Sequence, residues 1–237
     1  FMSVSVTQAA DYTFHGASQF DEDHPFTRLM RKFEQLTDLY NTSGKSLEWV
    51  MHLNRELGVE KDYFNYMSQG ISVDYAVVSP AHMSTYSKWA TPMDPPFLFR
   101  DMTHWAKVLS GDTLQPIDDD ILKRADVIIL GYGGGGVRNL IVNKPVSNMA
   151  EIKNLSVRVQ GAPIWSTSFQ AAGMAPTVSA YDEVYNAIQT NRIAAAENEA
   201  AGLLQMKFYE VGPHISMTQH AITIRPLGFA NKTFVKL

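Results

Sequence analysis

Residues 158–198 read RVQGAPIWSTSFQAAGMAPTVSAYDEVYNAIQTNRIAAAEN, and this stretch decides the fold class. Short apolar segments alternate in it with amphipathic ones, and Gly161, Pro163 and Gly173 mark the breaks between them. Strands that alternate with helices predict an α/β fold with largely parallel sheets. The expected elements are a strand over 155–160, a helix over 162–172, an extended segment over 176–179, a helix over 182–190 and a strand over 193–196.

The same alternation extends to both sides of this stretch. Two extended segments, 130–136 and 220–225, lie where the chain would cross between two halves, and a pair of such crossings predicts a hinge with a cleft beside it. We therefore predict two α/β lobes, one made of residues 1–134 with 223–237 and the other of 135–222. The further expected strands are 12–17, 47–53, 72–79, 126–131, 137–142 and 215–224, and the further expected helices are 25–40, 60–69, 101–109, 112–123, 149–153 and 199–210.

Composition excludes several classes of protein. The chain has 237 residues, 45% of them hydrophobic, and a net charge of −4, which argues against a nucleic-acid-binding surface. No apolar run reaches the length of a membrane span, so the chain is not expected to cross a membrane itself. The absence of cysteine removes thiol catalysis, cysteine-based zinc sites and disulfides.

The N-terminal residues 1–10 lack a basic region followed by a long apolar one, so no intact signal peptide is expected there. Two interpretations of residues 7–10 are open. They are either what remains after cleavage of a signal peptide, or a frayed tail.

Arg158 is the most informative single residue. It lies between Val157 and Val159, and a cation in an apolar strand is costly to bury unless an anion meets it. Arginine suits that task because its planar guanidinium can hold a carboxylate through two parallel hydrogen bonds. The partner is either a carboxylate of the protein itself or one that belongs to a ligand.

The glycine-rich segment 131–136 formally matches the dinucleotide motif G-x-G-x-x-G. A dinucleotide site also requires the glycines to open a helix, whereas 137–142 is strand-like and no suitable acidic residue follows it. We interpret the glycines as a bend where the backbone passes close to another segment. Arg138 follows directly, and it is either a surface charge or a second guanidinium on the cleft wall.

Signatures of metal and nucleophile chemistry are missing. The seven histidines contain no H-E-x-x-H, and G-x-S-x-G does not occur, so neither a metal nor a cofactor is predicted. Glu197 and Glu199 flank Asn198 and could serve as an acid–base pair, or else cap a helix or bind hydroxyl groups. Tyr181 precedes an expected helix and either stacks on a ligand or fills an interface between lobes.

An ordered set of segments resembles one family over nearly the whole chain from about Asp11. The chain is similar to the extracytoplasmic solute receptors of TRAP transporters, of the DctP type. The segments that carry the resemblance are 158–163 (RVQGAP), 180–189 (AYDEVYNAIQ), 197–199 (ENE) and 207–211 (KFYEV), supported by 22–25 (EDHP), 54–58 (NRELG), 74–79 (DYAVVS), 96–101 (PFLFRD) and 136–139 (GVRN).

The resemblance implies a periplasmic binding protein, not an enzyme, whose two lobes close on an organic acid. By the family's pattern Arg158 pairs with the ligand carboxylate, Asn198 contacts the same group, Arg138 is a second arginine nearby and Tyr181 lines the pocket. The family commonly has Glu-Asn-Pro where this chain has Glu-Asn-Glu199.

That departure, together with Gln160, resembles members that bind sugar acids such as uronates, with Glu199 and Gln160 as hydroxyl partners. His24 and Ser79 are further expected ligand contacts, supplied by the first lobe. The resemblance also implies membrane subunits of a TRAP transporter as partners, and further helices beyond the position of Leu237 that brace both lobes. The alternative is an enzyme that acts on a sugar acid with Glu197 or Glu199 as acid or base.

Overall fold

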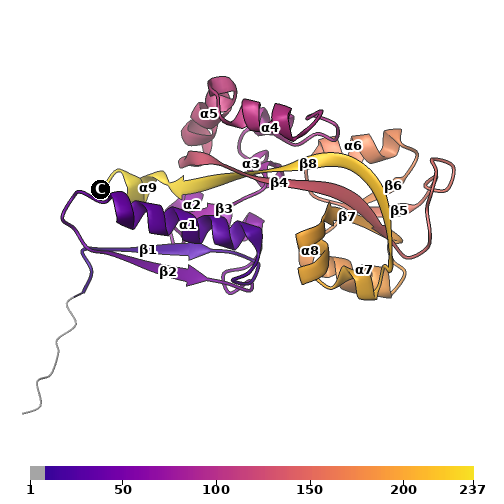
Figure 1. Ribbon diagram of the computed structural model, residues 1–237, viewed down its shortest axis with the longest axis horizontal. Coiled ribbons are helices and arrows are strands. Elements are labelled where there is room, and N and C mark those ends of the chain that lie inside the picture. The colour runs from indigo at the N-terminus through magenta and orange to yellow at the C-terminus, as the bar shows by residue number, and fades with distance from the viewer. Residues whose placement is uncertain (1–8) are drawn as a thin grey trace, which may run out of the picture.

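A computed structural model describes residues 9–237 and shows two α/β lobes joined by two long strands (Figure 1). Residues 7 and 8 of the expected signal-peptide remnant, 7–10, lie outside the described residues. The strands are β1 (Tyr12–Ala17), β2 (Leu47–His52), β3 (Tyr75–Val77), β4 (Val127–Val142), β5 (Ser156–Val159), β6 (Ala175–Val178), β7 (Ala195–Glu199) and β8 (His214–Ala230). The helices are α1 (Pro25–Tyr40), α2 (Glu60–Gln69), α3 (Pro80–Met83), α4 (Met102–Leu109), α5 (Gln115–Ala125), α6 (Pro163–Ala171), α7 (Val184–Gln189), α8 (Ala200–Gln205) and α9 (Asn231–Phe234).

All eight strands belong to one mixed sheet in the order β2-β1-β3-β8-β4-β7-β5-β6. The outer pairs within each lobe are parallel, as the alternation of strands and helices predicts. The central pairs, β3 with β8, β8 with β4 and β4 with β7, are antiparallel. The two-lobed α/β architecture is thus confirmed, and the two lobes share a continuous sheet because β4 and β8 run through both (Figure 1).

Strand β4 unites two segments that the sequence predicted as separate strands, 126–131 and 137–142. Its glycine-rich middle stays paired to β8, with register shifts at Ile129/Gly131 and Gly134/Val137. Strand β8 is correspondingly longer than the expected segment 215–224 and reaches Ala230. No helix follows the glycines directly, so the dinucleotide interpretation fails in the way the sequence indicated.

Local sequence signals set most helix ends. His24 caps α1 by accepting a hydrogen bond from the backbone N–H of Phe26, and Pro25 occupies the first turn. Gly70 ends α2 in the left-handed conformation that glycine adopts without strain. The expected helix over 149–153 is wrong, because that segment forms turns, and the one over 112–123 begins as a short 3₁₀ turn before α5.

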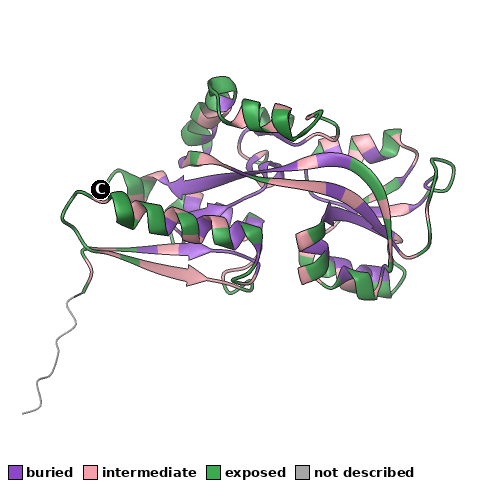
Figure 2. Ribbon diagram, viewed as in Figure 1, coloured by how far each residue is buried: buried purple, intermediate pink, exposed green. Residues whose placement is uncertain are grey.

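Each lobe has its own buried core (Figure 2). In the lobe of β1–β3, one cluster surrounds Tyr63 and Met67, and a second surrounds Tyr75. In the lobe of β5–β7, the clusters surround Trp165 and Phe208. Among residues 9–237 we find no helix that is both long enough and apolar enough to cross a lipid bilayer.

Gly134 lies on β4 where a side chain would meet the backbone of β8. Its φ is +117°, and a Cβ added there would lie 2.2 Å from the carbonyl oxygen of Thr223. Gly134→Ala should therefore destabilise the protein by at least about 2 kcal/mol, since both the conformation and the contact are unfavourable for a side chain. The measurement is the midpoint of urea unfolding.

Gly131→Ala is the matched control, because nothing lies within 4 Å of a Cβ added to Gly131. We expect its unfolding midpoint to stay close to that of the unsubstituted protein. Equal effects of the two substitutions would contradict the close-approach explanation of the glycine run.

Candidate functional site

A cavity of about 340 Å³ lies between the two lobes and is lined by side chains from both. Its volume falls at the small end of the range of ligand pockets in proteins. Six of the eight residues that the sequence singled out line it, namely Arg158, Asn198, Arg138, Tyr181, Gln160 and Glu199. The fold therefore brings these six residues together at one cavity, although they come from β4, β5 and the residue after it, β7, and the segment before α7.

Arg158 is buried in this wall without a protein carboxylate as partner. Its Nε donates a 2.9 Å hydrogen bond to the carbonyl oxygen of Ser179, and no carboxylate lies within 4.0 Å of its guanidinium nitrogens among residues 9–237. Burial lowers its pKa, and the more distant Glu197 only partly opposes that effect. A buried guanidinium with unpaired positive charge is a strong binding site for an anion.

Tyr181 and Asn198 flank Arg158. The Arg158 guanidinium carbon lies 5.5 Å from the centroid of the Tyr181 ring, within cation–π distance. Asn198 Nδ2 donates to the hydroxyl oxygen of Tyr181 at 2.5 Å, and Asn198 Oδ1 is buried without a partner. The unpartnered amide oxygen can accept a hydrogen bond from a ligand hydroxyl group.

Arg138, by contrast, is held by the protein itself. Its Nε and Nη2 donate to the two carboxylate oxygens of Glu197 at 2.6 and 2.8 Å, and its Nη1 donates to Glu199 Oε2 at 2.9 Å. The guanidinium of Arg138 is thus bonded to both glutamates, and its direct contact with a ligand stays a prediction. Glu199 Oε1 remains buried and unpartnered, so it is available to a ligand.

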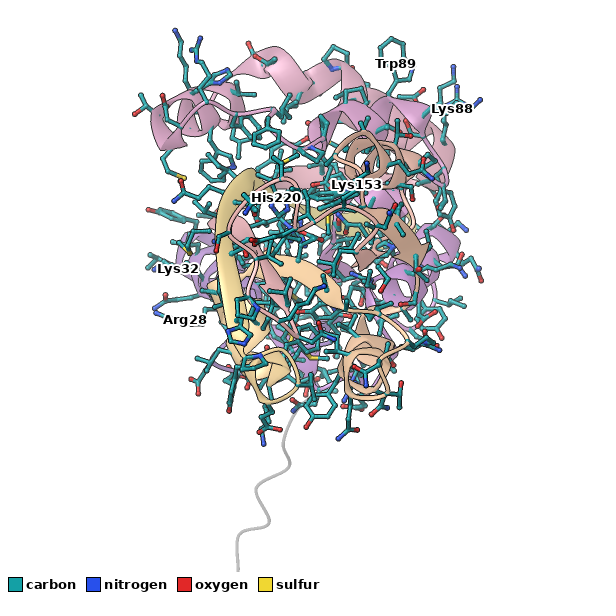
Figure 3. All side chains as sticks on the ribbon, turned by 90° about the vertical axis from the view of Figure 1, so that its right-hand side faces the viewer. Arg28, Lys32, Lys88, Trp89, Lys153 and His220 are labelled. Carbon is teal, nitrogen blue, oxygen red and sulfur yellow. The ribbon has the colours of Figure 1, made fainter. Side chains whose placement is uncertain are left out.

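His220 lies on β8 (Figure 3) and joins this buried network. Its Nε2 lies 3.2 Å from Glu197 Oε2, and it is the last of the four residues between Ser216 and Ala221 that lie opposite Asn139 alone. Burial alone would raise the pKa of Glu197, but Arg138 and His220 outweigh it and lower that pKa to about 2. A carboxylate of such low basicity is a poor general base near neutral pH.

Gln160 connects the two lobes. Its Nε2 donates to Asp94 Oδ2 at 2.9 Å, and Ser79 Oγ donates to Gln160 Oε1 at 3.3 Å. Trp165 Nε1 donates to the same Asp94 oxygen at 3.0 Å. Ser79 itself does not line the cavity; it caps α3 and positions Gln160 from behind.

His24 also lies behind the cavity wall. Its ring stacks on the wall residue Phe20 at 3.7 Å between centroids, and its Nδ1 is occupied by the cap of α1. Burial lowers its pKa to about 4, so near neutral pH the proton resides on Nε2, which is buried without an acceptor. The structure places His24 and Ser79 next to the wall residues, and direct contact of either with a ligand stays a prediction.

The wall residues that the sequence reasoning missed include Glu60, His82 and Arg225. Glu60 begins α2 and accepts a 2.7 Å hydrogen bond from the backbone N–H of Ser79. Arg225 lies on β8 between Ile224 and Pro226, and it is 5% exposed. The criterion that found Arg158, a cation inside an apolar strand, would also have found Arg225 had the expected strand not ended at Ile224.

Comparison with known proteins gives a consistent result. The family described as "Bacterial extracellular solute-binding protein, family 7", or DctP, matches residues 17–237. The chain belongs to this family. Its members are extracytoplasmic solute-binding proteins, so the resemblance drawn from the sequence is confirmed.

Individual relatives place the chain within the DctP family. A solute-binding protein of Sulfitobacter sp. (strain NAS-14.1) is 46% identical over 98% of this chain and 70% of its own length. A crystal structure of a TRAP periplasmic solute-binding protein from Sulfitobacter sp. NAS-14.1 with bound α-D-taluronate has a TM-score of 0.92 and 47% identity, over 95% of this chain and 73% of the other. One from Roseobacter denitrificans with bound L-galactonate has a TM-score of 0.88 and 26% identity, over 97% of this chain and 75% of the other.

The enzyme alternative finds no support among these DctP relatives, which carry ligands as solute-binding proteins. The low pKa of Glu197 and the occupation of Glu199 Oε2 by Arg138 argue in the same direction. The chain is a solute-binding protein.

Proposed function

We propose that this chain is the periplasmic receptor of a TRAP transporter and that it captures a sugar acid such as a uronate. The observation that carries the proposal is Arg158, a buried guanidinium that faces the cavity with no carboxylate partner within 4.0 Å in the described chain. The ligand carboxylate would take both free Nη groups, and the second N–H of Asn198 Nδ2, whose first N–H is donated to Tyr181, would add a hydrogen bond. The taluronate and galactonate bound to the two relatives named above support a sugar acid as ligand.

The remaining wall residues support the same ligand class. Glu199 Oε1 and Asn198 Oδ1 are buried acceptors without donors, and hydroxyl groups of a sugar are suitable donors. Gln160 would add a hydrogen bond from the lobe interface, and Tyr181 would cover one face of the ligand. Arg138 would act through the glutamates that it holds.

Ligand capture would close the lobes. The cavity draws on both, so a ligand that contacts both walls binds the closed arrangement more tightly and shifts the population toward it. The proposed lobes are 1–134 with 223–237, and 135–222. The closed, loaded form would then dock on the membrane subunits of the transporter.

The test is a binding panel of D-taluronate, D-galacturonate, D-glucuronate and L-galactonate, with succinate for comparison. At a concentration of about 100 Kd, a true ligand should raise the Tm by about 5–10 °C, because it binds the folded state only. Mass spectrometry should recover the ligand unchanged. A panel in which no sugar acid shifts the Tm, or in which succinate shifts it most, contradicts the proposed ligand class.

A further inference from the structure

Arg225 and Glu60 form a second polar centre on the cavity wall. Both belong to the lobe of β1–β3 or the strand that enters it, whereas Arg158 and Asn198 belong to the other lobe. Arg225 is 5% exposed and Glu60 is 4% exposed. Neither residue lies in the segments that carry the resemblance to the DctP family, and neither belongs to the proposed carboxylate anchor.

The two side chains stand apart by a distance that suits an intervening oxygen. Arg225 Nε lies 4.0 Å from Glu60 Oε1, which is too long for a hydrogen bond, and Arg225 Nε is buried without any acceptor. The rest of the pair is fixed: Arg225 Nη1 donates to the carbonyl oxygen of Ile224 at 2.8 Å, and its guanidinium lies 5.1 Å from the centroid of Phe26. Glu60 Oε2 is held by the backbone N–H of Ser79.

The 4.0 Å separation of these atoms matches a bridging hydroxyl group. Such a group can accept from Arg225 Nε and donate to Glu60 Oε1 at the same time, with both hydrogen bonds near their usual lengths of about 2.7–2.9 Å. A carboxylate oxygen would accept from Arg225 but would face a Glu60 oxygen with no proton between them. Desolvated like charges in contact are strongly unfavourable.

The charges buried around the cavity also favour a ligand hydroxyl group over a second ligand carboxylate. The guanidinium groups are those of Arg138, Arg158 and Arg225, and the carboxylates in contact with them are those of Glu60, Glu197 and Glu199. Of these three guanidinium groups, Arg158 alone lacks a carboxylate within 4.0 Å among the described residues, so it is the one buried cation of the wall without a counter-ion; the other cation on the wall, Lys61, is exposed. The wall therefore offers a buried counter-ion to one ligand carboxylate and none to a second.

We propose that Arg225 and Glu60 are specificity-determining residues that bind a ligand hydroxyl group and restrict this site to polyhydroxylated monocarboxylates, excluding diacids of the same carbon chain. This inference rests on the proposed function, since it assumes that Arg158 receives the ligand carboxylate. It adds that the remainder of the ligand presents hydroxyl groups and not a second carboxylate.

The test compares each uronate with the aldarate that has a second carboxylate at the other end: D-galacturonate with galactarate, and D-glucuronate with D-glucarate. Calorimetry gives Kd for each, and the quantity of interest is the ratio of the two. In the unsubstituted protein we expect the uronate to bind at least about tenfold more tightly than its aldarate, because a polar site rejects a group that leaves its atoms mispaired. Comparable affinities would overturn the inference without any variant.

Glu60→Gln sharpens the test. The substitution keeps the size of the side chain, removes its charge and offers an N–H to an incoming carboxylate. We expect the uronate-to-aldarate preference to fall by at least about tenfold, through weaker uronate binding and stronger aldarate binding. Ring and open-chain differences between the two ligands cancel, because the same pair is compared in both proteins.

Glu56→Gln is the matched control, since Glu56 undergoes the same chemical change four residues earlier but is 59% exposed and paired with His52. It should leave the preference within about twofold, as expected for an exposed charge. The inference would be overturned if Glu60→Gln changed the uronate-to-aldarate preference by less than tenfold, or by no more than Glu56→Gln changes it. Failure of the unsubstituted protein to bind any uronate is a different result, because it refutes the proposed function itself.

Discussion

Arg158→Ala should weaken binding of the preferred uronate by at least about a hundredfold. Arg158 is 6% exposed, its hydrogen-bond partner among residues 9–237 is the carbonyl oxygen of Ser179, and the ligand carboxylate would be its counter-ion. Removing one partner of a buried, hydrogen-bonded charge pair costs about 2–5 kcal/mol in other interfaces. Calorimetry with D-galacturonate or D-taluronate measures the loss directly.

The stability of the ligand-free protein should respond in the opposite direction. Burial lowers the pKa of Arg158, which means that the charged form is disfavoured in the empty site. Arg158→Ala should therefore unfold at an equal or higher urea concentration while it loses affinity. Arg158→Lys should also bind poorly, because one ammonium group does not reproduce the planar fork.

Arg192→Ala serves as the control for Arg158. Its guanidinium is 60% exposed and lies 3.7 Å from Glu183, outside the cavity. Its uronate affinity should stay within about twofold of the unsubstituted value. An Arg158→Ala protein that retains uronate affinity within threefold would remove the anchor on which the proposed function depends.

Arg138→Met should destabilise the fold by about 3–5 kcal/mol, the usual cost of leaving buried charges without their counter-ion. Arg138 is 3% exposed, and the substitution leaves the carboxylates of both Glu197 and Glu199 without this counter-ion. Urea unfolding followed by circular dichroism at pH 7 provides the measurement. Arg124→Met, at an exposed pair with Asp120, is the control and should cost less than about 1 kcal/mol.

The effect of Arg138→Met should depend on pH in a defined direction. The pKa of Glu197 is lowered from 4.5 to about 2 in the folded protein, so the pairing stabilises the fold fully above pH 4.5 and is lost as pH falls toward 2. The difference in unfolding free energy between the two proteins should therefore narrow on acidification. A difference below 1 kcal/mol at pH 7, or one that widens in acid, would contradict a structural role for this ion pair.

The sequence anticipated much of the fold because its signals are local. The strand of β1, the helices α1 and α2 and the cap of α4 by Asp101 follow from apolar spacing and capping residues alone. The glycine run was correctly interpreted as a close approach, since Gly134 passes against Thr223. The continuity of β4 and the antiparallel centre of the sheet were missed, because strand pairing joins residues such as Arg138 and Ala221 that are distant in the chain.

The candidate site shows the same division between features that local sequence predicts and features that depend on contacts distant in the chain. The chemical type of Arg158 and its apolar neighbours determined in advance that this residue requires an anion, because a buried guanidinium is costly wherever it lies. Which anion meets which arginine was decided only by the tertiary structure: β7 brings Glu197 and Glu199 to Arg138, and β8 brings Arg225 to within 4.0 Å of Glu60. The sequence specifies the charges, whereas their pairing depends on distances of a few ångströms between strands, and only the folded chain sets those distances.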